Sequence, residues 1–196
     1  MLELVQADPT RRAAYGELFG GEAVRVYPWS DFTRPDDAIR IEVLVYPLRE
    51  PGQNHVVMVT SGYSELGQPR RELIQYLPHG RRADAHRLHS AAYAAAVAGR
   101  ELDFGSTMTL PYPSGSAWPH TILLPPPVSA HSEFSMEMEG GPVRLLWHVP
   151  LSESEFAYQA EYGIGPLLRG MSSAELPWFF DEATRPVLVG RPSPED

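Results

Sequence analysis

Two residue types are absent from this sequence of 196 residues: it contains no cysteine and no lysine, so arginine supplies all 16 basic side chains. The absence of cysteine excludes a disulfide framework, a thiol nucleophile, an iron–sulfur cluster and a cysteine-ligated zinc site. The absence of lysine excludes Schiff-base catalysis and the lysine of phosphate-binding loops. Several common enzyme classes are therefore ruled out before any motif is considered.

Basic charge and long apolar runs are both scarce. The 16 basic residues face 25 acidic ones, which gives a net charge of −9 and argues against binding to nucleic acid or to anionic lipid. No apolar run has the length of a membrane span, and the first residues lack the basic and apolar segments of a signal peptide. We therefore expect a cytoplasmic protein with neither a nucleic-acid nor a membrane partner.

The remaining composition is that of a folded domain. Hydrophobic residues make up 43% of the chain and aromatic residues 10%, which is typical of globular proteins. The length corresponds to one domain. We assign residues 1–190 to that domain and expect residues 191–196, which contain two prolines, to form a disordered tail.

Apolar periodicity predicts alternating strands and helices. Ile39, Ile41 and Val43 alternate with Arg40 and Glu42, as in a strand with one face exposed. The strands that we expect cover residues 24–27, 39–46, 55–60, 72–77, 104–110, 119–124, 133–139 and 143–149. The helices that we expect cover residues 9–19, 83–99, 152–162 and 172–182; the last two open with the capping boxes Ser152–Glu155 and Ser172–Glu175.

The clearest amphipathic strand is acidic. Glu133, Glu137 and Glu139 alternate with apolar residues, and the Gly140–Gly141 pair that follows is a signal for a two-residue hairpin turn. Together with Glu153 and Glu155 these side chains could make one side of the protein strongly negative. Either this is a solvated face that keeps the protein soluble, or it is a docking surface for a basic partner.

Candidate catalytic and metal-binding residues are few. His86 and His89 lie three residues apart on an expected helix and could share a metal ion, although no carboxylate completes a familiar spacing. His148 lies in an apolar strand, where a core histidine is the usual explanation, and His131 has no motif around it. A serine–histidine–aspartate triad has no supporting pattern. We therefore assign no catalytic, cofactor-binding or metal-binding residue, and we expect a protein that is not an enzyme.

The order of several motifs nevertheless resembles a known family, the suppressor of fused domain family in its bacterial single-domain form. The resemblance covers about residues 16–168. It depends on the order and spacing of the segments 39–47, 57–64, 71–78, 105–107 and 147–155, followed by Gly163 and Leu167–Leu168. In this comparison Thr60, Ser61 and Gly62 form a turn that closes a buried strand, whereas Glu72 is either buried and paired or exposed.

The resemblance implies an α+β (mixed α/β) fold, a single domain with a central, largely antiparallel sheet and packed helices, and it implies no catalysis or cofactor. The animal member of the family has two domains and sequesters Gli-type transcription factors by accepting a short peptide strand. Bacterial members are often inferred to be immunity proteins that neutralise a toxin.

Two functional hypotheses from different classes follow, with a third kept as a remote alternative. The first is an immunity protein that covers the active site of a toxin, such as a basic nuclease. The second is a regulatory or scaffold module that recognises an extended peptide by strand addition. The third is a hydrolase or metal enzyme that uses His86, His89, His131 or His148. The sequence leaves open the partner, the binding surface and the oligomeric state.

Overall fold

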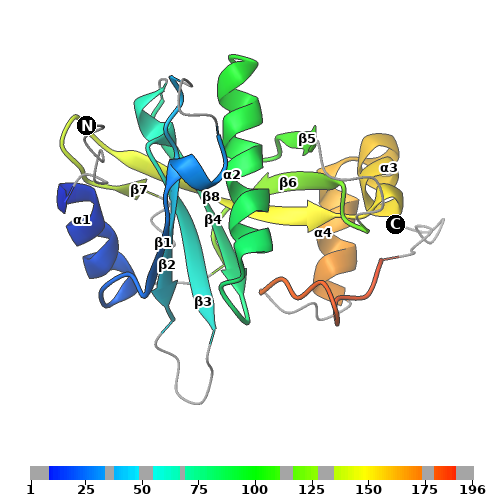
Figure 1. The fold of residues 1–196 in the computed structure, drawn as a ribbon. Helices are drawn as coiled ribbons and strands as arrows, with labels where there is room; N and C mark the ends of the chain where they lie inside the picture. The colour runs from blue at the N-terminus through cyan, green and yellow to red at the C-terminus, as the bar shows by residue number, and fades with distance from the viewer. Residues whose placement is uncertain are drawn as a thin grey trace.

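The protein is an α+β domain built around one mixed sheet of eight strands. We analysed a computed structural model, which describes residues 9–33, 38–48, 55–66, 69–110, 117–127, 135–173 and 179–188. The strand order is β1-β2-β3-β4-β8-β6-β5, and β7 also pairs with β8. Helix α2 crosses in front of the sheet in Figure 1, whereas α1 lies beside the β1–β2 end and α3 and α4 lie at the opposite end.

The strands are short and mostly antiparallel. They are β1 (Arg25–Tyr27), β2 (Glu42–Pro47), β3 (Val56–Ser61), β4 (Arg71–Leu77), β5 (Thr107–Thr109), β6 (His120–Leu124), β7 (Ser135–Met136) and β8 (Val143–Leu151). The helices are α1 (Pro9–Phe19), α2 (Arg82–Val97), α3 (Glu153–Tyr162) and α4 (Ile164–Ser173), with short 3-10 turns η1 (Trp29–Asp31) and η2 (Tyr63–Glu65). The expected α+β fold with a largely antiparallel sheet is thus confirmed.

Strand β2 differs from its expected half-exposed pattern because both faces of the sheet are covered. Val43, Val45, Met58 and Leu73 belong to the hydrophobic cluster under α2. The alternate residues of the same strands, including Leu44, Tyr46, Val57 and Ile74, pack with Tyr15 and Phe19 of α1. Glu42, expected on the exposed face, is only 7% exposed and lies 3.6 Å from Arg12 of α1.

Small side chains let α2 approach the sheet closely. Ala85, Ala91 and Ala92 are fully buried, and Ala95 is 1% exposed. Alanine combines high helix propensity with a small volume, so it suits a helix that packs directly on strands. The structure confirms the helix that we expected over residues 83–99, with the bounds Arg82–Val97.

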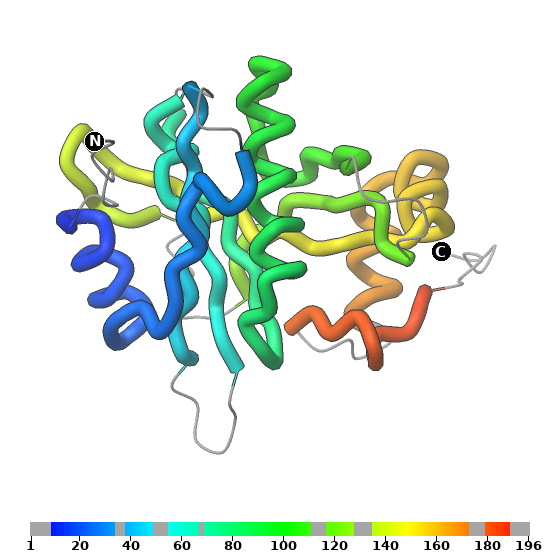
Figure 2. The backbone as a smooth tube through the Cα atoms, in the orientation of Figure 1, coloured from blue at the N-terminus to red at the C-terminus, as the bar shows by residue number. Residues whose placement is uncertain are grey.

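Strand β8 joins the two halves of the sheet. It runs parallel to β4 from the pair Arg71–Arg144 to the pair Ile74–Trp147. Its opposite edge pairs first with β7 and then with β6. Beyond Trp147 the register with β4 ends, and the carbonyl of Tyr76 accepts a hydrogen bond of 2.8 Å from Phe180 N. Figure 2 shows this C-terminal segment (red) starting beside the lower end of α2.

Two local predictions in the second half of the chain are wrong. In the described part of the acidic segment only Ser135 and Met136 pair as a strand, and six residues separate them from β8, so Gly140–Gly141 is not a two-residue hairpin turn. Ser172 does not open a helix but lies in the last turn of α4, which begins directly after Gly163. Residues 191–196 lie outside the described residues, so the disordered tail stays a prediction.

None of the described helices combines the length and the apolar character that crossing a membrane requires.

Candidate protein-binding surface

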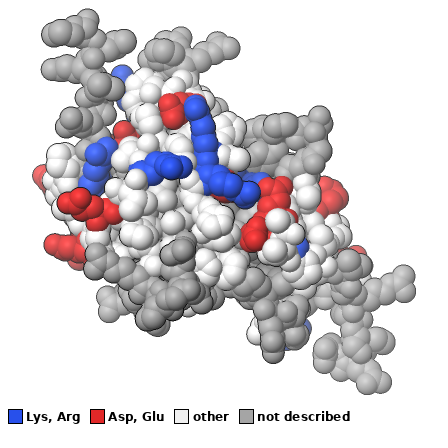
Figure 3. All heavy atoms as spheres, turned by 60° about the horizontal axis from the view of Figure 1, so that its bottom comes forward, with Lys and Arg blue, Asp and Glu red and all other residues white. Residues whose placement is uncertain are grey.

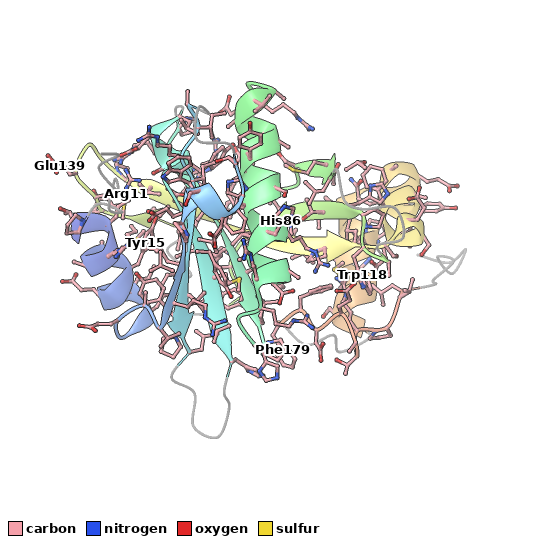
Figure 4. The ribbon with its side chains drawn as sticks, viewed as in Figure 1. Arg11, Tyr15, His86, Trp118, Glu139 and Phe179 are labelled. Atoms are coloured by element: carbon pink, nitrogen blue, oxygen red, sulfur yellow. The ribbon has the colours of Figure 1, made fainter. Side chains whose placement is uncertain are left out.

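The structure separates the four described glutamates of the five that the sequence grouped together. Glu137 and Glu139 are exposed near the start of β8, whereas Glu153 and Glu155 follow its end. Strand β8, which lies between the two pairs, has nine residues and a length of roughly 27 Å, since its ends are eight steps of about 3.4 Å apart. Figure 4 places Glu139 beside α1, on the opposite side of the molecule from α3. Glu133 lies outside the described residues, so its position is not part of this comparison.

Glu155 is unavailable to a partner because it is completely buried. Its carboxylate accepts a hydrogen bond of 2.9 Å from Ser152 N, while the Ser152 hydroxyl accepts one from Glu155 N, which forms the predicted capping box. The other carboxylate oxygen accepts hydrogen bonds from Arg185 and from Leu188 N. Glu155 therefore stabilises the fold.

Glu153 is exposed but takes part in a series of three interacting side chains that the sequence did not reveal. One oxygen of its carboxylate lies 2.7 Å from His120 Nε2, and His120 Nδ1 lies 2.9 Å from the hydroxyl of Thr109. The imidazole also stacks on Phe156 at 4.0 Å. Thr109 and His120 are cross-strand partners in β5 and β6, so the three side chains tie the start of α3 to this edge of the sheet. Only the cross-strand register, which is not local in sequence, could have revealed the arrangement.

Glu137 and Glu139 border a groove of about 470 Å³, which we call the acidic groove. It lies between α1 and the β7–β8 connection, and Figure 4 shows Arg11 and Glu139 near each other there. Its described lining combines charged and apolar side chains: Thr10, Arg11, Ala14, Glu65, Arg70, Glu137, Met138, Glu139 and Gly140.

The arginines of the acidic groove are already engaged. Arg11 forms an ion pair with Glu65. Arg70 donates hydrogen bonds of 2.7 and 2.8 Å to the carbonyl oxygens of Glu139 and Gly141, so it holds the turn. Among the described residues, no ion pair neutralises Glu137 or Glu139. The groove therefore presents two exposed negative charges.

A buried carboxylate fixes the wall of the acidic groove. Glu72 is 0% exposed and accepts hydrogen bonds from the Thr60 hydroxyl at 2.6 Å, Gly62 N at 3.0 Å and Ser64 N at 3.1 Å. Burial raises the pKa of Glu72 above its ordinary value, and the hydrogen bonds from Thr60 and Ser64 oppose that effect. These contacts hold the turn that leads into η2, which carries Glu65. Of the two possibilities that the sequence left for Glu72, the buried one is correct.

Charges of both signs are mixed elsewhere on the surface. On the face shown in Figure 3, arginine and acidic side chains are interspersed and separated by uncharged surface. An example is Arg144, which pairs with Asp103 at 3.2 Å while both side chains remain about half exposed. The described charged side chains on this face therefore do not form one continuous acidic surface.

The described candidate histidines do not form a metal-binding cluster. His86 is exposed and His89 is buried, and both contact the ring of Phe32, at 5.8 and 4.6 Å between ring centroids. His148 is buried in β8, and His131 lies outside the described residues. No group of three or more potential metal-binding side chains occurs in the part of the chain that the structure describes.

Solved structures of other proteins have a fold similar to that of this chain. The structure matches a putative suppressor of fused homologue from Neisseria gonorrhoeae with a TM-score of 0.72 and 17% identity, over 94% of this chain and 98% of that one. It also matches a chain of the Sufu–Fu complex with a TM-score of 0.62 and 13% identity, over 91% and 90% of the two chains. No curated protein sequence gives a significant match.

The sequence itself matches a family model. The model of the suppressor of fused protein (SUFU) covers residues 37–183, which is well over half of the chain. The matched segment runs from the start of β2 through α4 to the C-terminal segment that bonds to Tyr76. The motif order that suggested the family is thus confirmed by an independent match, and this chain belongs to the suppressor of fused family.

Proposed function

We propose that this chain is a non-catalytic protein-binding domain that acts in the cytoplasm as an immunity protein, and that it binds and occludes a cognate toxin through the acidic groove. The observation that carries the proposal is the pair of unneutralised carboxylates, Glu137 and Glu139, on a groove with rigid walls. Two further facts support it: the net charge is −9, and a chain of the same fold is found in the Sufu–Fu complex.

The mechanism is occlusion of the toxin by a preformed surface. Glu72 and Arg70 fix the two sides of the acidic groove through backbone contacts, so little conformational entropy is lost on binding. Negative charge attracts a basic partner before contact, which raises the association rate and excludes acidic competitors. A nuclease domain, whose substrate is polyanionic, has the complementary charge.

The decisive experiment is coexpression with the product of each adjacent gene. We expect one product to be toxic alone, to be tolerated when this protein is present, and to copurify with it in stoichiometric amounts. If no neighbouring product forms a complex or is neutralised, the proposal is wrong.

Charge reversal tests the surface itself. We expect Glu137→Arg and Glu139→Arg each to weaken the complex at least tenfold, mainly through slower association, and added salt to reduce the difference. Glu161→Arg is the matched control, because Glu161 is exposed on α3, away from the groove. Equal effects of all three substitutions would indicate a general charge effect and exclude the acidic groove as the binding surface.

A second candidate function is recognition of an extended peptide by strand addition. It is favoured by the sheet order, in which the short strands β1 and β5 are the two terminal members. Such edges have unpaired backbone groups that a peptide strand can use. A peptide array distinguishes the candidates: strand addition predicts binding to short linear peptides, whereas the immunity role predicts binding to a folded partner.

A further inference from the structure

A second cavity, of about 320 Å³, lies between β8, α4 and the C-terminal segment. We call it the β8–α4 cavity. This cavity adjoins the second half of β8, whereas the acidic groove lies near the start of that strand, so the two are far apart in the fold. Its described lining is Leu124, Pro127, Trp147, His148, Val149, Leu168, Met171, Ser172, Phe179, Phe180 and Arg185.

The separation of two parallel strands creates the space. Strands β4 and β8 pair as far as Ile74 and Trp147 and then part. Phe180 enters the gap and donates its backbone N–H to Tyr76 O, while β8 continues outward with β6. Ligand sites commonly form where neighbouring strands of a sheet diverge, because no strand there fills the space between them.

The walls are mostly apolar and come from rigid elements. Trp147 and Val149 belong to β8, Leu168 and Met171 belong to α4, and the C-terminal segment adds Phe180. A volume of about 320 Å³ is at the lower end of the range for small-molecule sites, which are characteristically apolar with a few polar groups. The size and lining favour a compact apolar ligand.

Polar atoms at this cavity lack partners. Trp147 Nε1 and both ring nitrogens of His148 are buried without a hydrogen bond to another described residue, and His148 is 0% exposed. The pKa of His148 is lowered to about 3, mainly by burial and to a smaller extent by the positive charge of the nearby Arg87. At neutral pH the imidazole is therefore uncharged, with one nitrogen able to donate and the other able to accept.

The charged side chain at the cavity is already neutralised. Arg185 donates to Glu155 at 3.1 Å and also to the carbonyl of Pro150, and its guanidinium stacks on Trp118 at 4.7 Å. Burying an unpaired ligand charge beside this neutral surface would cost free energy without a compensating partner. A neutral ligand avoids that cost.

We propose that the β8–α4 cavity binds a neutral, largely apolar small molecule that carries one hydroxyl or carbonyl group. The apolar body occupies the space between Trp147, Met171 and Phe180, and the polar group bonds to a buried nitrogen of Trp147 or His148. This site is independent of the proposed partner surface, so either proposal can fail without the other.

Three matched probes test the proposal: 2-naphthol, naphthalene and 2-naphthoate, which share a ring system and differ in one group. Titrations of the full chain would be followed by amide chemical shifts. We expect 2-naphthol to bind at the lining residues about 2- to 10-fold more tightly than naphthalene, as one hydrogen bond allows, and far more tightly than the charged 2-naphthoate. No binding by any probe, or 2-naphthoate binding as tightly as 2-naphthol, would overturn the proposal.

Variants locate the bound probe. Leu168→Trp and Met171→Trp place a large ring in the cavity, and we expect each to weaken 2-naphthol binding at least tenfold. Leu168 is 38% exposed, so that variant has room to fold if Met171→Trp does not. Val97→Trp, at a 62% exposed site on α2, is the control and should leave binding unchanged. If both cavity variants fold and still bind 2-naphthol as tightly as the wild-type protein, the proposed site is wrong. If the variants weaken partner capture but not 2-naphthol binding, the cavity instead accepts a side chain of the partner, which also contradicts the proposal.

Discussion

Arg185 and Glu155 form a buried ion pair across 30 residues of sequence, with 3.1 Å between the guanidinium and the carboxylate. Their side chains are 5% and 0% exposed. The same carboxylate completes the cap of α3 through Ser152 N. One side chain thus joins the start of a helix to the C-terminal segment, and the wall of the β8–α4 cavity depends on that connection.

Substituting only one partner of this ion pair should strongly destabilise the protein. Arg185→Met leaves the Glu155 carboxylate buried without its cation, and Glu155→Gln leaves the Arg185 guanidinium without its anion. We expect each substitution to lower the free energy of unfolding by about 3–5 kcal/mol. The double variant should lose less than the sum of the two, because no unpaired charge remains buried. Urea unfolding of all four proteins measures this coupling.

An exposed ion pair supplies the control for that measurement. Arg144 and Asp103 lie 3.2 Å apart with side chains 44% and 53% exposed. Water screens such a pair, so Arg144→Met should cost no more than about 1 kcal/mol. Equal losses for the exposed and buried pairs would show that burial does not govern the Arg185–Glu155 interaction.

The turn after β3 should tolerate no side chain at Gly62. Its φ of 111° is unfavourable for other residues, and a Cβ there would lie 2.6 Å from the carbonyl oxygen of Arg40. Gly99 also has a positive φ, of 59°, but a Cβ at that position would meet nothing within 4 Å. We expect Gly62→Ala to lower the free energy of unfolding by at least about 1 kcal/mol more than Gly99→Ala, as chemical unfolding would show. Equal losses would mean that the close approach to Arg40 carries no cost.

Removing the Glu72 carboxylate should loosen the same turn. Glu72→Ala leaves the N–H groups of Gly62 and Ser64 without this acceptor, and the Thr60 hydroxyl keeps only the longer hydrogen bond of 3.4 Å to Leu73 O. Unsatisfied buried groups cost about 1–3 kcal/mol each, so we expect a loss of about 3 kcal/mol or more, together with faster amide exchange at Gly62 and Ser64. Glu72→Gln keeps one carbonyl oxygen and should lose less. If the two variants were equally stable, the hydrogen bonds would not be the stabilising interaction.

Patterns in the sequence predicted those structural features that depend only on residues close together in the chain. The Ser152 cap, the Ala-rich helix and the buried strand before Gly62 follow from short-range preferences of the backbone. The pairing of β4 with β8 and the bond between Glu155 and Arg185 depend on residues far apart in the chain. No periodicity encodes such contacts, which explains why Glu155 was expected at a binding surface.

The errors near α4 and in the acidic segment have similar causes. Gly163 ends α3 as predicted, but a second helix begins at the next residue and carries Pro166 in its first turn, where a missing N–H costs little. The capping-box pattern at Ser172 therefore lies inside a helix that packing against Trp147 and Val149 stabilises. The alternation of exposed and buried side chains through Glu137 and Glu139 is genuine, but residues 137–142 form the connection between β7 and β8, in which Gly141 N donates to Met138 O, so the paired residues end at Met136.

His148 should make the protein sensitive to mild acid. Burial lowers its pKa from 6.5 to about 3, so the unfolded chain takes up a proton at this site before the folded protein does. The neutral imidazole therefore costs no stability above pH 6.5, and the free energy of unfolding falls as the pH drops from 6.5 towards 3, by up to about 1.4 kcal/mol per pH unit. His148→Met removes the titrating group and replaces it with a large apolar side chain, so we expect the stability of this variant to fall less steeply in this pH range.

Urea unfolding at a series of pH values compares the wild-type and His148→Met proteins, with His79→Met, at an exposed position, as the control. Parallel stability curves for the wild-type and His148→Met proteins would contradict a buried neutral histidine, whereas a flatter curve for His148→Met alone would identify this imidazole as a source of acid sensitivity.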